Sequence, residues 1–336
     1  MTKIMNSFLK KTPHIDFIKI RWFGFILAFL VFIGSIVSLS IKGLDYGIDF
    51  KGGLLIEIQS HEPTQAADLR ARLETLGLED LTIQSIGQEG TSFLIYTTGT
   101  KKAVQTEMET YNQVKELLGE EVSFRRVEMV GPTIGQELIK NSVIATALAI
   151  LSICIYIAVR FEWPFALTSM VGLTFVMTVI VGFCSFFGVD FNMTIVAAIM
   201  SLAGYSVNDT VVTFDRVRDN LKKYHRMPID ELLNKSINET LSRTLLTSLS
   251  TILMLIVLLF FGGETLFGFS LVFLVGIFIG TYASIFIAVQ LLRLFDLRKI
   301  SSHEGSDPYA AATAYEKEAQ KLPLQASSCK NCAKHG

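Results

Sequence analysis

The chain has little of what a soluble enzyme or a disulfide-linked secreted protein uses. Its 336 residues include only five histidines and four cysteines, and 18% of them are charged, with a formal net charge of −1. The near balance of charge gives no electrostatic reason to expect nucleic acid binding. The sequence shows no metal-binding cluster, phosphate-binding loop or nucleophile–base motif. We therefore expect no enzyme activity, no metal and no cofactor.

Long apolar runs are the dominant feature of the sequence. Hydrophobic residues make up 50% of the chain. They are concentrated in runs that can each cross a hydrocarbon layer of about 30 Å as a helix, alone or with modest extension. The runs lie near Ile20–Ser40, Val143–Val159, Phe165–Phe187, Met193–Phe214, Leu245–Phe261 and Phe267–Leu292. The sequence therefore predicts an α-helical polytopic membrane protein with six transmembrane helices.

Basic residues gather at the ends of the runs that share one side of the membrane if the N-terminus is inside. The short turns on the opposite side, Gly188–Asp190 and Gly262–Glu264, carry acids and no base. By the positive-inside rule, both termini are predicted to be cytoplasmic. The first run follows a long basic approach and exceeds a usual signal core, which favours a retained anchor over a cleaved signal peptide.

These observations divide the chain into successive parts. They are a basic cytoplasmic N-terminus (1–19), transmembrane helix 1 (20–41), an exported periplasmic or extracytoplasmic α+β domain (42–137), transmembrane helices 2–6 with a cytoplasmic amphipathic loop at 216–242 (138–295), and a disordered cytoplasmic tail (296–336). The tail carries Cys329 and Cys332, but this motif with His335 supplies three ligands, fewer than a closed tetrahedral metal site needs. The role of the tail stays open.

The region between the first two runs has the pattern of a small α+β domain. Strands and helices alternate in the order βαββαβ, which suggests a ferredoxin-like fold. The predicted elements are Leu54–Gln59, Ala66–Leu76, Leu81–Ile86, Ser92–Thr97, Lys102–Leu118 and Val122–Val130. A docking or substrate-contacting role is favoured over catalysis, although the fold pattern alone implies no function.

One acidic residue stands inside the fourth apolar run. A carboxylate such as that of Asp209 costs about 2.5–3.5 kcal/mol at the centre of a membrane helix, so it normally faces a protein interior and has a partner. Arg243, at the start of the fifth run, is the best candidate for that partner. On a helix, Tyr205 and Asn208 fall on the broad face that carries Asp209.

A polar stripe on the fifth run extends this hypothesis. Thr247, Ser250 and Thr251 follow Arg243 on one helix face, which favours a hydrated interior shared with Asp209. Two simpler interpretations remain open. The hydroxyl groups could bond to their own backbone, and Arg243 could reach the inner membrane surface as a topology anchor.

Several motifs resemble those of SecF proteins in the SecD/SecF family, which belongs to the resistance-nodulation-division superfamily. They are Asp45-Tyr-Gly-Ile-Asp-Phe-Lys-Gly-Gly53, Val130-Gly-Pro132, Gly204-Tyr-Ser-Val-Asn-Asp-Thr-Val-Val-Thr-Phe-Asp-Arg216 and Thr240-Leu-Ser-Arg-Thr-Leu-Leu-Thr-Ser248. The family-motif residues singled out are Asp45, Gly47, Asp49, Gly52, Gly53, Asp215 and Arg216.

The resemblance implies a subunit of the protein-export machinery in the bacterial inner membrane. It implies a complex with SecD, association with the SecYEG channel and YajC, and action on an unfolded preprotein during translocation. It links Asp209 and Arg243 to proton passage, so that the proton motive force promotes late steps of export. A change in the separation of the two groups would change the proton affinity of Asp209.

Two other classes of function are carried beside this one. A proton-coupled exporter of small molecules or lipids is the first, since other members of the superfamily have that activity. The second is a structural scaffold in which Asp209 and Arg243 only fix the register of two helices. The short exported domain and the six spans argue against a self-sufficient pump.

Overall fold

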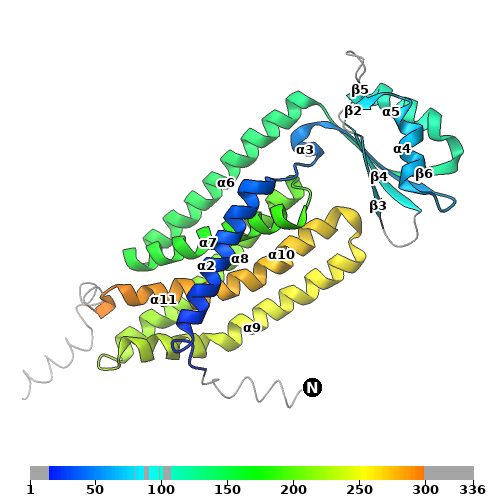
Figure 1. Ribbon diagram of the computed structural model, residues 1–336. Helices are drawn as coiled ribbons and strands as arrows, with labels where there is room; N and C mark the ends of the chain where they lie inside the picture. Colours follow the sequence, from blue (N-terminus) through cyan, green and yellow to red (C-terminus); the bar gives the residue numbers. More distant parts are fainter. Residues whose placement is uncertain (1–14, 80, 87–90, 98, 101–106, 299–336) are drawn as a thin grey trace, which may run out of the picture.

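The computed structural model describes residues 15–298, apart from residues 80, 87–90, 98 and 101–106. Figure 1 shows a bundle of long helices with a smaller α+β domain at one end. We call that end of the bundle the domain side and the opposite end, where α2 begins and α11 ends, the terminal side. The tail with Cys329 and Cys332, and residues 1–14 of the basic N-terminus, lie outside the described residues.

The bundle confirms the six predicted spans, because six of its helices are long and apolar enough to cross a membrane. The helices are α2 (Arg21–Lys42), α6 (Pro132–Arg160), α7 (Trp163–Phe187), α8 (Met193–Lys223), α9 (Ile229–Phe261) and α10 (Gly263–Ala283). The last continues through a π-helical turn, η2 (Ser284–Ala288), then α11 (Val289–Leu291) and a 3₁₀ turn, η3 (Leu292–Leu294).

Three helices form the interior of the bundle. About half of the most apolar stretch of α7, α8 and α10 is buried, against 11% for α6 and 17% for α9. Glycines bring the central helices together. A side chain at Gly276 of α10 would overlap Leu202 of α8, and a Cβ atom at Gly182 of α7 would lie 2.3 Å from the Cβ atom of Ser35 of α2. Small residues are typical of such close packing in membranes. The outer faces of α2, α6 and α9 are left for lipid or for another protein.

The segment 216–242 differs from the expected loop, because it is helical on both sides of a short connection at residues 224–228. The apolar residues Leu232, Leu233 and Ile237 are at most 1% exposed and join a cluster with Val217 and Leu221 of α8. Their helical spacing therefore serves packing within the chain, and α8 and α9 both extend beyond their apolar runs.

The residues before α2 are fastened to the extension of α9. The amide of Asn238 accepts a hydrogen bond from the Ile15 nitrogen at 3.0 Å and donates one to the Ile15 oxygen at 2.8 Å. Phe17 is buried in the same apolar cluster. A side-chain amide that satisfies both main-chain groups of one residue fixes the chain as a neighbouring strand would.

The α+β domain confirms the predicted order of strands and helices. Its elements are β1 (Gly53–Ser60), α4 (Ala66–Glu74), β2 (Leu78–Glu79), β3 (Thr82–Ile86), β4 (Ser92–Thr97), β5 (Gly99–Thr100), α5 (Glu107–Leu118), η1 (Gly119–Glu121) and β6 (Val122–Val130). The main sheet is antiparallel with the order β3-β4-β1-β6, and β2 pairs with β5 beside it. Apolar residues of β1 and β4 pack with Leu73 of α4 and Val114 of α5. A short helix, α3 (Ile48–Lys51), lies between α2 and β1.

The contact between α2 and α7 generates a first prediction. We expect Gly182→Ala to destabilise the protein by about 1–3 kcal/mol, because its methyl group overlaps Ser35 and overpacking costs that much. Gly34→Ala is the matched control, since nothing lies within 4 Å of a Cβ atom at Gly34. Thermal unfolding of the purified protein in detergent would measure both. Equal stability of the two variants would contradict the packing of α2 on α7.

Candidate functional site

The carboxylate of Asp209 lies inside the helix bundle. Its residue is 9% exposed on α8, and its Oδ2 atom has no hydrogen-bond partner among the described residues. The hydroxyl group of Thr244 on α9 lies beside the carboxylate. A buried polar atom without a protein partner calls for an explanation, such as a bridging water molecule or a functional role.

Hydroxyl groups from three helices line this part of the interior. The Tyr205 hydroxyl donates to Ser248 at 3.3 Å, and the hydroxyl groups of Ser248 and Thr281 are also 3.3 Å apart. These contacts join α8, α9 and α10. One turn beyond Asp209, the hydroxyl groups of Thr213 and Thr240 are 3.5 Å apart. Neutral hydroxyl groups therefore lie on both sides of Asp209 along the bundle interior.

Ser284 is a polar residue at the level of Asp209 that sequence reasoning missed. A Cβ atom at Gly280 of α10 would lie 3.2 Å from the Ser206 hydroxyl of α8. Both helices run from the domain side, so one turn further along them Ser284 stands level with Asp209. The Ser284 hydroxyl is buried and has no partner among the described residues. Its π-helical turn is a feature often found at functional sites, but nothing in the apolar sequence predicts it.

The stripe of α9 that faces α8 is not the one the sequence favoured. Thr240, Thr244 and Ser248 are buried, whereas Arg243, Thr247 and Ser250 are exposed. The hydroxyl of Thr247 donates to the Arg243 oxygen at 3.1 Å, and that of Thr251 donates to the Thr247 oxygen at 3.1 Å. The backbone-bonding alternative thus describes these two hydroxyl groups. Successive residues on a helix point about 100° apart, so Thr244 faces α8 and its neighbour Arg243 does not.

Arg243 lines a charged crevice on the terminal side rather than contacting Asp209. The crevice has a volume of about 230 Å³ and is lined by Val212, Asp215, Arg216, Asp219, Glu239, Thr240 and Arg243. Within the described residues, Arg243 forms no ion pair with Asp209 or with any other acid. Asn208 is exposed on the outer face of α8, away from Asp209. The structure therefore brings Tyr205 and Asp209 into one interior and places Asn208 and Arg243 outside it.

The motif residues at the end of the membrane-crossing part of α8 hold three helices together. Asp215 pairs with Arg160 of α6 at 3.0 Å, and Arg216 pairs with Glu239 of α9 at 2.7 Å. Glu239 also accepts a hydrogen bond from Asn220 at 2.8 Å. These ion pairs tie α8 to α6 and α9 beside the crevice.

The other motif residues lie at the opposite end of α8. We call residues 45–53 the glycine segment; it includes α3 and runs into β1. Gly52 and Gly53 have positive φ angles of 75° and 125°, which only glycine adopts readily. The Gly47 nitrogen donates to the Phe191 oxygen at 2.9 Å, and the Phe191 nitrogen donates to the Asp45 oxygen at 2.7 Å.

Comparison with known proteins decides the family. A profile described as "Protein export membrane protein SecD/SecF, C-terminal" matches residues 110–298, and one described as "SecD/SecF GG Motif" matches residues 37–64. The chain belongs to the SecF group of the SecD/SecF family. The second profile contains the whole glycine segment, and the first contains Asp209 and Arg243.

Individual relatives agree with this assignment. The SecF translocase subunit of Magnetococcus marinus is 41% identical over 90% of this chain and 99% of its own length. That of Pseudomonas aeruginosa is 38% identical over 84% and 92%. The crystal structure of SecDF from Thermus thermophilus, titled a translocon-associated membrane protein, has a TM-score of 0.76 at 33% identity. The match covers 85% of this chain but only 39% of SecDF.

The assignment sets the general function. The protein is a multi-pass membrane protein and a SecF-type subunit of a protein translocase. It is a transport component, and protein translocation is favoured over the export of small molecules or lipids.

The hydroxyl contacts generate a second prediction. In a double-mutant cycle, we expect Tyr205→Phe and Ser248→Ala to couple by about 0.6 kcal/mol, the average for hydrogen bonds between membrane helices. Ser250→Ala is the matched control, because Ser250 is exposed on the other face of α9, and it should be additive with Tyr205→Phe. Reversible unfolding in mixed detergent would measure both cycles. Coupling to Ser250 instead of Ser248 would show that α9 is rotated from the arrangement described here.

Proposed function

We propose that this subunit uses the proton motive force to promote late steps of protein export across the bacterial cytoplasmic membrane. Asp209 is the residue that takes up and releases the proton. The observation that supports this most is its buried carboxylate, with an oxygen that lacks a partner among the described residues. Acids in membrane helices usually mark such pathways because they are costly to bury. The buried hydroxyl group of Ser284, which also has no partner among the described residues, is a second polar group at the same level of the bundle.

The separation of Asp209 and Arg243 suggests how a proton could be exchanged. While Arg243 stays in the charged crevice, its guanidinium group does not stabilise a charge on Asp209. A rearrangement of α9 against α8 that brings the guanidinium group near Asp209 favours the carboxylate and releases the proton. The coupling is reciprocal, so protonation must in turn favour the arrangement that holds Arg243 away. If the protein were only a structural scaffold, Asp209 and Arg243 would instead stay paired and fix the register of their helices.

The energy that one proton supplies by crossing the membrane is comparable with the cost of rearranging α9 against α8. A charge that crosses a potential of 100 mV supplies about 2.3 kcal/mol, before any pH difference is added. That is enough to shift an equilibrium between two helix arrangements that differ by a few kcal/mol. The α+β domain would respond to this shift in equilibrium by holding or releasing an unfolded preprotein. Holding the preprotein would prevent it from moving back toward the cytoplasm.

Partners follow from the surfaces that the chain leaves open. Along α8, Ser201, Gly204 and Asn208 form an exposed stripe, and nothing lies within 4 Å of a Cβ atom at Gly204. Small residues permit close approach of a second helix. On α9, the polar residues Arg243, Thr247 and Ser250 are exposed, and polar side chains are unfavourable against lipid. We assign this surface to SecD, since SecDF extends well beyond the part matched here. SecYEG and YajC are the further proposed partners, with both termini cytoplasmic and the α+β domain exported.

A third prediction tests Asp209 directly. In vesicles that contain SecYEG, this chain and SecD, Asp209→Asn should abolish the stimulation of preprotein translocation by a proton gradient, because asparagine cannot carry the proton. Complex assembly should be unchanged. Asp68→Asn, an exposed acid on α4, is the control and should respond to the gradient as the natural chain does. If the gradient still stimulates the Asp209 variant fully, the proton pathway lies elsewhere, and the carboxylate is structural.

A fourth prediction separates the buried face of α9 from its exposed face. Thr244→Val keeps the shape of the side chain but removes the hydroxyl group beside Asp209. We expect it to weaken gradient-driven translocation roughly fivefold, as the loss of about 1 kcal/mol would. Thr247→Val, one turn along on the exposed face, should have a much smaller effect. The reverse order in the same vesicle assay would favour the stripe that contains Arg243.

A further inference from the structure

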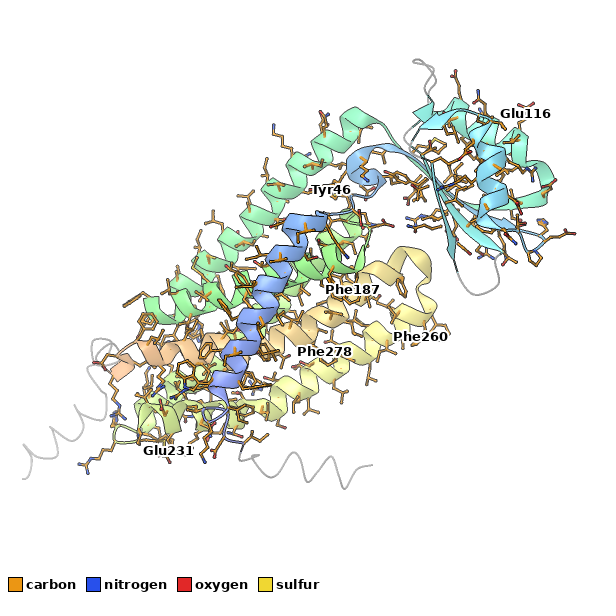
Figure 2. All side chains as sticks on the ribbon, viewed as in Figure 1. Tyr46, Glu116, Phe187, Glu231, Phe260 and Phe278 are labelled. Carbon is orange, nitrogen blue, oxygen red and sulfur yellow. The ribbon has the colours of Figure 1, made fainter. Side chains whose placement is uncertain are left out.

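The glycine segment is bonded to the turn that precedes α8. Its main chain exchanges two hydrogen bonds with Phe191, one from Gly47 and one to Asp45, which make a short parallel bridge between Tyr46 and Phe191. Figure 2 shows Tyr46 between the end of α2 and the α+β domain. Because these bonds involve main-chain groups, the position of this turn follows the glycine segment directly.

Asp49 extends the contact to the helix itself. Its carboxylate accepts a hydrogen bond from the nitrogen of Met193, the first residue of α8, at 2.8 Å. Asn192, the residue before the helix, accepts one from the Ile195 nitrogen at 3.0 Å. A helix start has free N–H groups and a partial positive charge, so a carboxylate there is favourable. One of the two side chains that cap α8 therefore comes from a distant segment of the chain.

The packing around Asp49 leaves little freedom. Phe50 stacks on Phe191 with ring centroids 6.0 Å apart. A Cβ atom at Gly135 of α6 would lie 2.8 Å from the Phe50 oxygen, and one at Gly47 would lie 3.1 Å from the Asn192 side chain. The glycine segment is thus wedged between the start of α6 and the start of α8.

The same segment is continuous with the sheet of the α+β domain. β1 begins at Gly53, and it pairs along its length with β6, which leads into α6 after Gly131. At the other end, Asp209 lies sixteen residues along α8 from Met193, or about 24 Å along a rigid helix. A rotation of the α+β domain would therefore move the glycine segment, and through it the start of α8, the helix that carries Asp209.

We propose that the glycine segment is the joint through which the α+β domain and α8 move together, and that Asp49 is the positioning residue that keeps the start of α8 in this joint. This inference rests on the proposed function of Asp209. It adds that the charge state of Asp209 is passed to the domain through the N-terminus of α8.

The test is a distance measurement that does not depend on export. Spin labels are placed by Asp68→Cys on α4 and Phe260→Cys at the domain-side end of α9 (Figure 2), in the full complex with SecD and with the natural cysteines replaced. Double electron–electron resonance then compares Asp209 with Asp209→Asn, which mimics the protonated acid. We expect Asp209→Asn to displace the distance distribution, and Asp49→Ala to remove most of that displacement.

Two further variants separate a joint from a simple helix cap. Asp49→Asn retains an acceptor oxygen and should preserve most of the displacement, which also guards against misfolding of Asp49→Ala. Asn192→Ala removes the helix's own cap while leaving the joint, and should preserve the displacement as well. If Asn192→Ala loses as much as Asp49→Ala, helix stability explains the effect and the joint is refuted.

The remaining outcomes also decide the matter. The proposal is overturned if Asp209→Asn does not displace the spin-label distance while Asp49 is present. It is also overturned if Asp209→Asn displaces that distance equally in the Asp49→Ala background. A failure of the proposed function would look different. In that case the translocation assay would show no role for Asp209 in the gradient response, while the displacement would still depend on Asp49.

Discussion

The burial of one carboxylate in a membrane bundle is the constraint on which the other features of the site depend. An acid facing hydrocarbon would be costly, so the helix that carries Asp209 has to lie at the centre of the protein. α8 does so, between α7, α9 and α10, and glycines on α10 let its backbone approach. Among the described residues, the side chain that lies beside the acid is the hydroxyl group of Thr244 and not a cation. Neutral neighbours solvate the acid without fixing its charge, which a residue that gains and loses a proton requires.

Much of the fold could be predicted because its signals are local. The six spans follow from the length of the apolar runs, and the βαββαβ order follows from the spacing of apolar residues between them. The structure confirms the six helices and the order of the α+β domain. The extensions of α8 and α9 could not be read in the same way. Residues 216–242 are polar enough to suggest a loop, and the apolar positions Leu232, Leu233 and Ile237 suit a membrane surface as well as a core. Only the partner surface on α8, with Val217 and Leu221, shows that they pack within the chain.

For the candidate site, part of the polar face of α8 could be predicted from the sequence, but the face of α9 that meets it could not. The cost of an acid in an apolar run singles out Asp209, but α9 carries polar residues at 243, 244, 247, 248, 250 and 251, which cover too wide an arc to define a face. A rotation of about 100° exchanges the two candidate stripes. Packing against α8 selects Thr244 and Ser248. Likewise, Asp215 pairs with Arg160, and no sequence spacing links those two positions.

The polar contacts of α8 differ between its two ends and its middle. At one end, ion pairs join Asp215 and Arg216 to α6 and α9, and at the other the Asp49 carboxylate caps the helix. Between them, the polar contacts near Asp209 are hydroxyl bonds of 3.3–3.5 Å, each worth about 0.6 kcal/mol in a membrane protein, and they lie beside close packing of α8 on α10. An input of about 2.3 kcal/mol per proton can exchange several such bonds, but it cannot dismantle the apolar packing. Because α8 is one continuous helix packed against α7 and α10, a change in these polar contacts displaces it as one body, and the displacement reaches the segments that are bonded to its two ends.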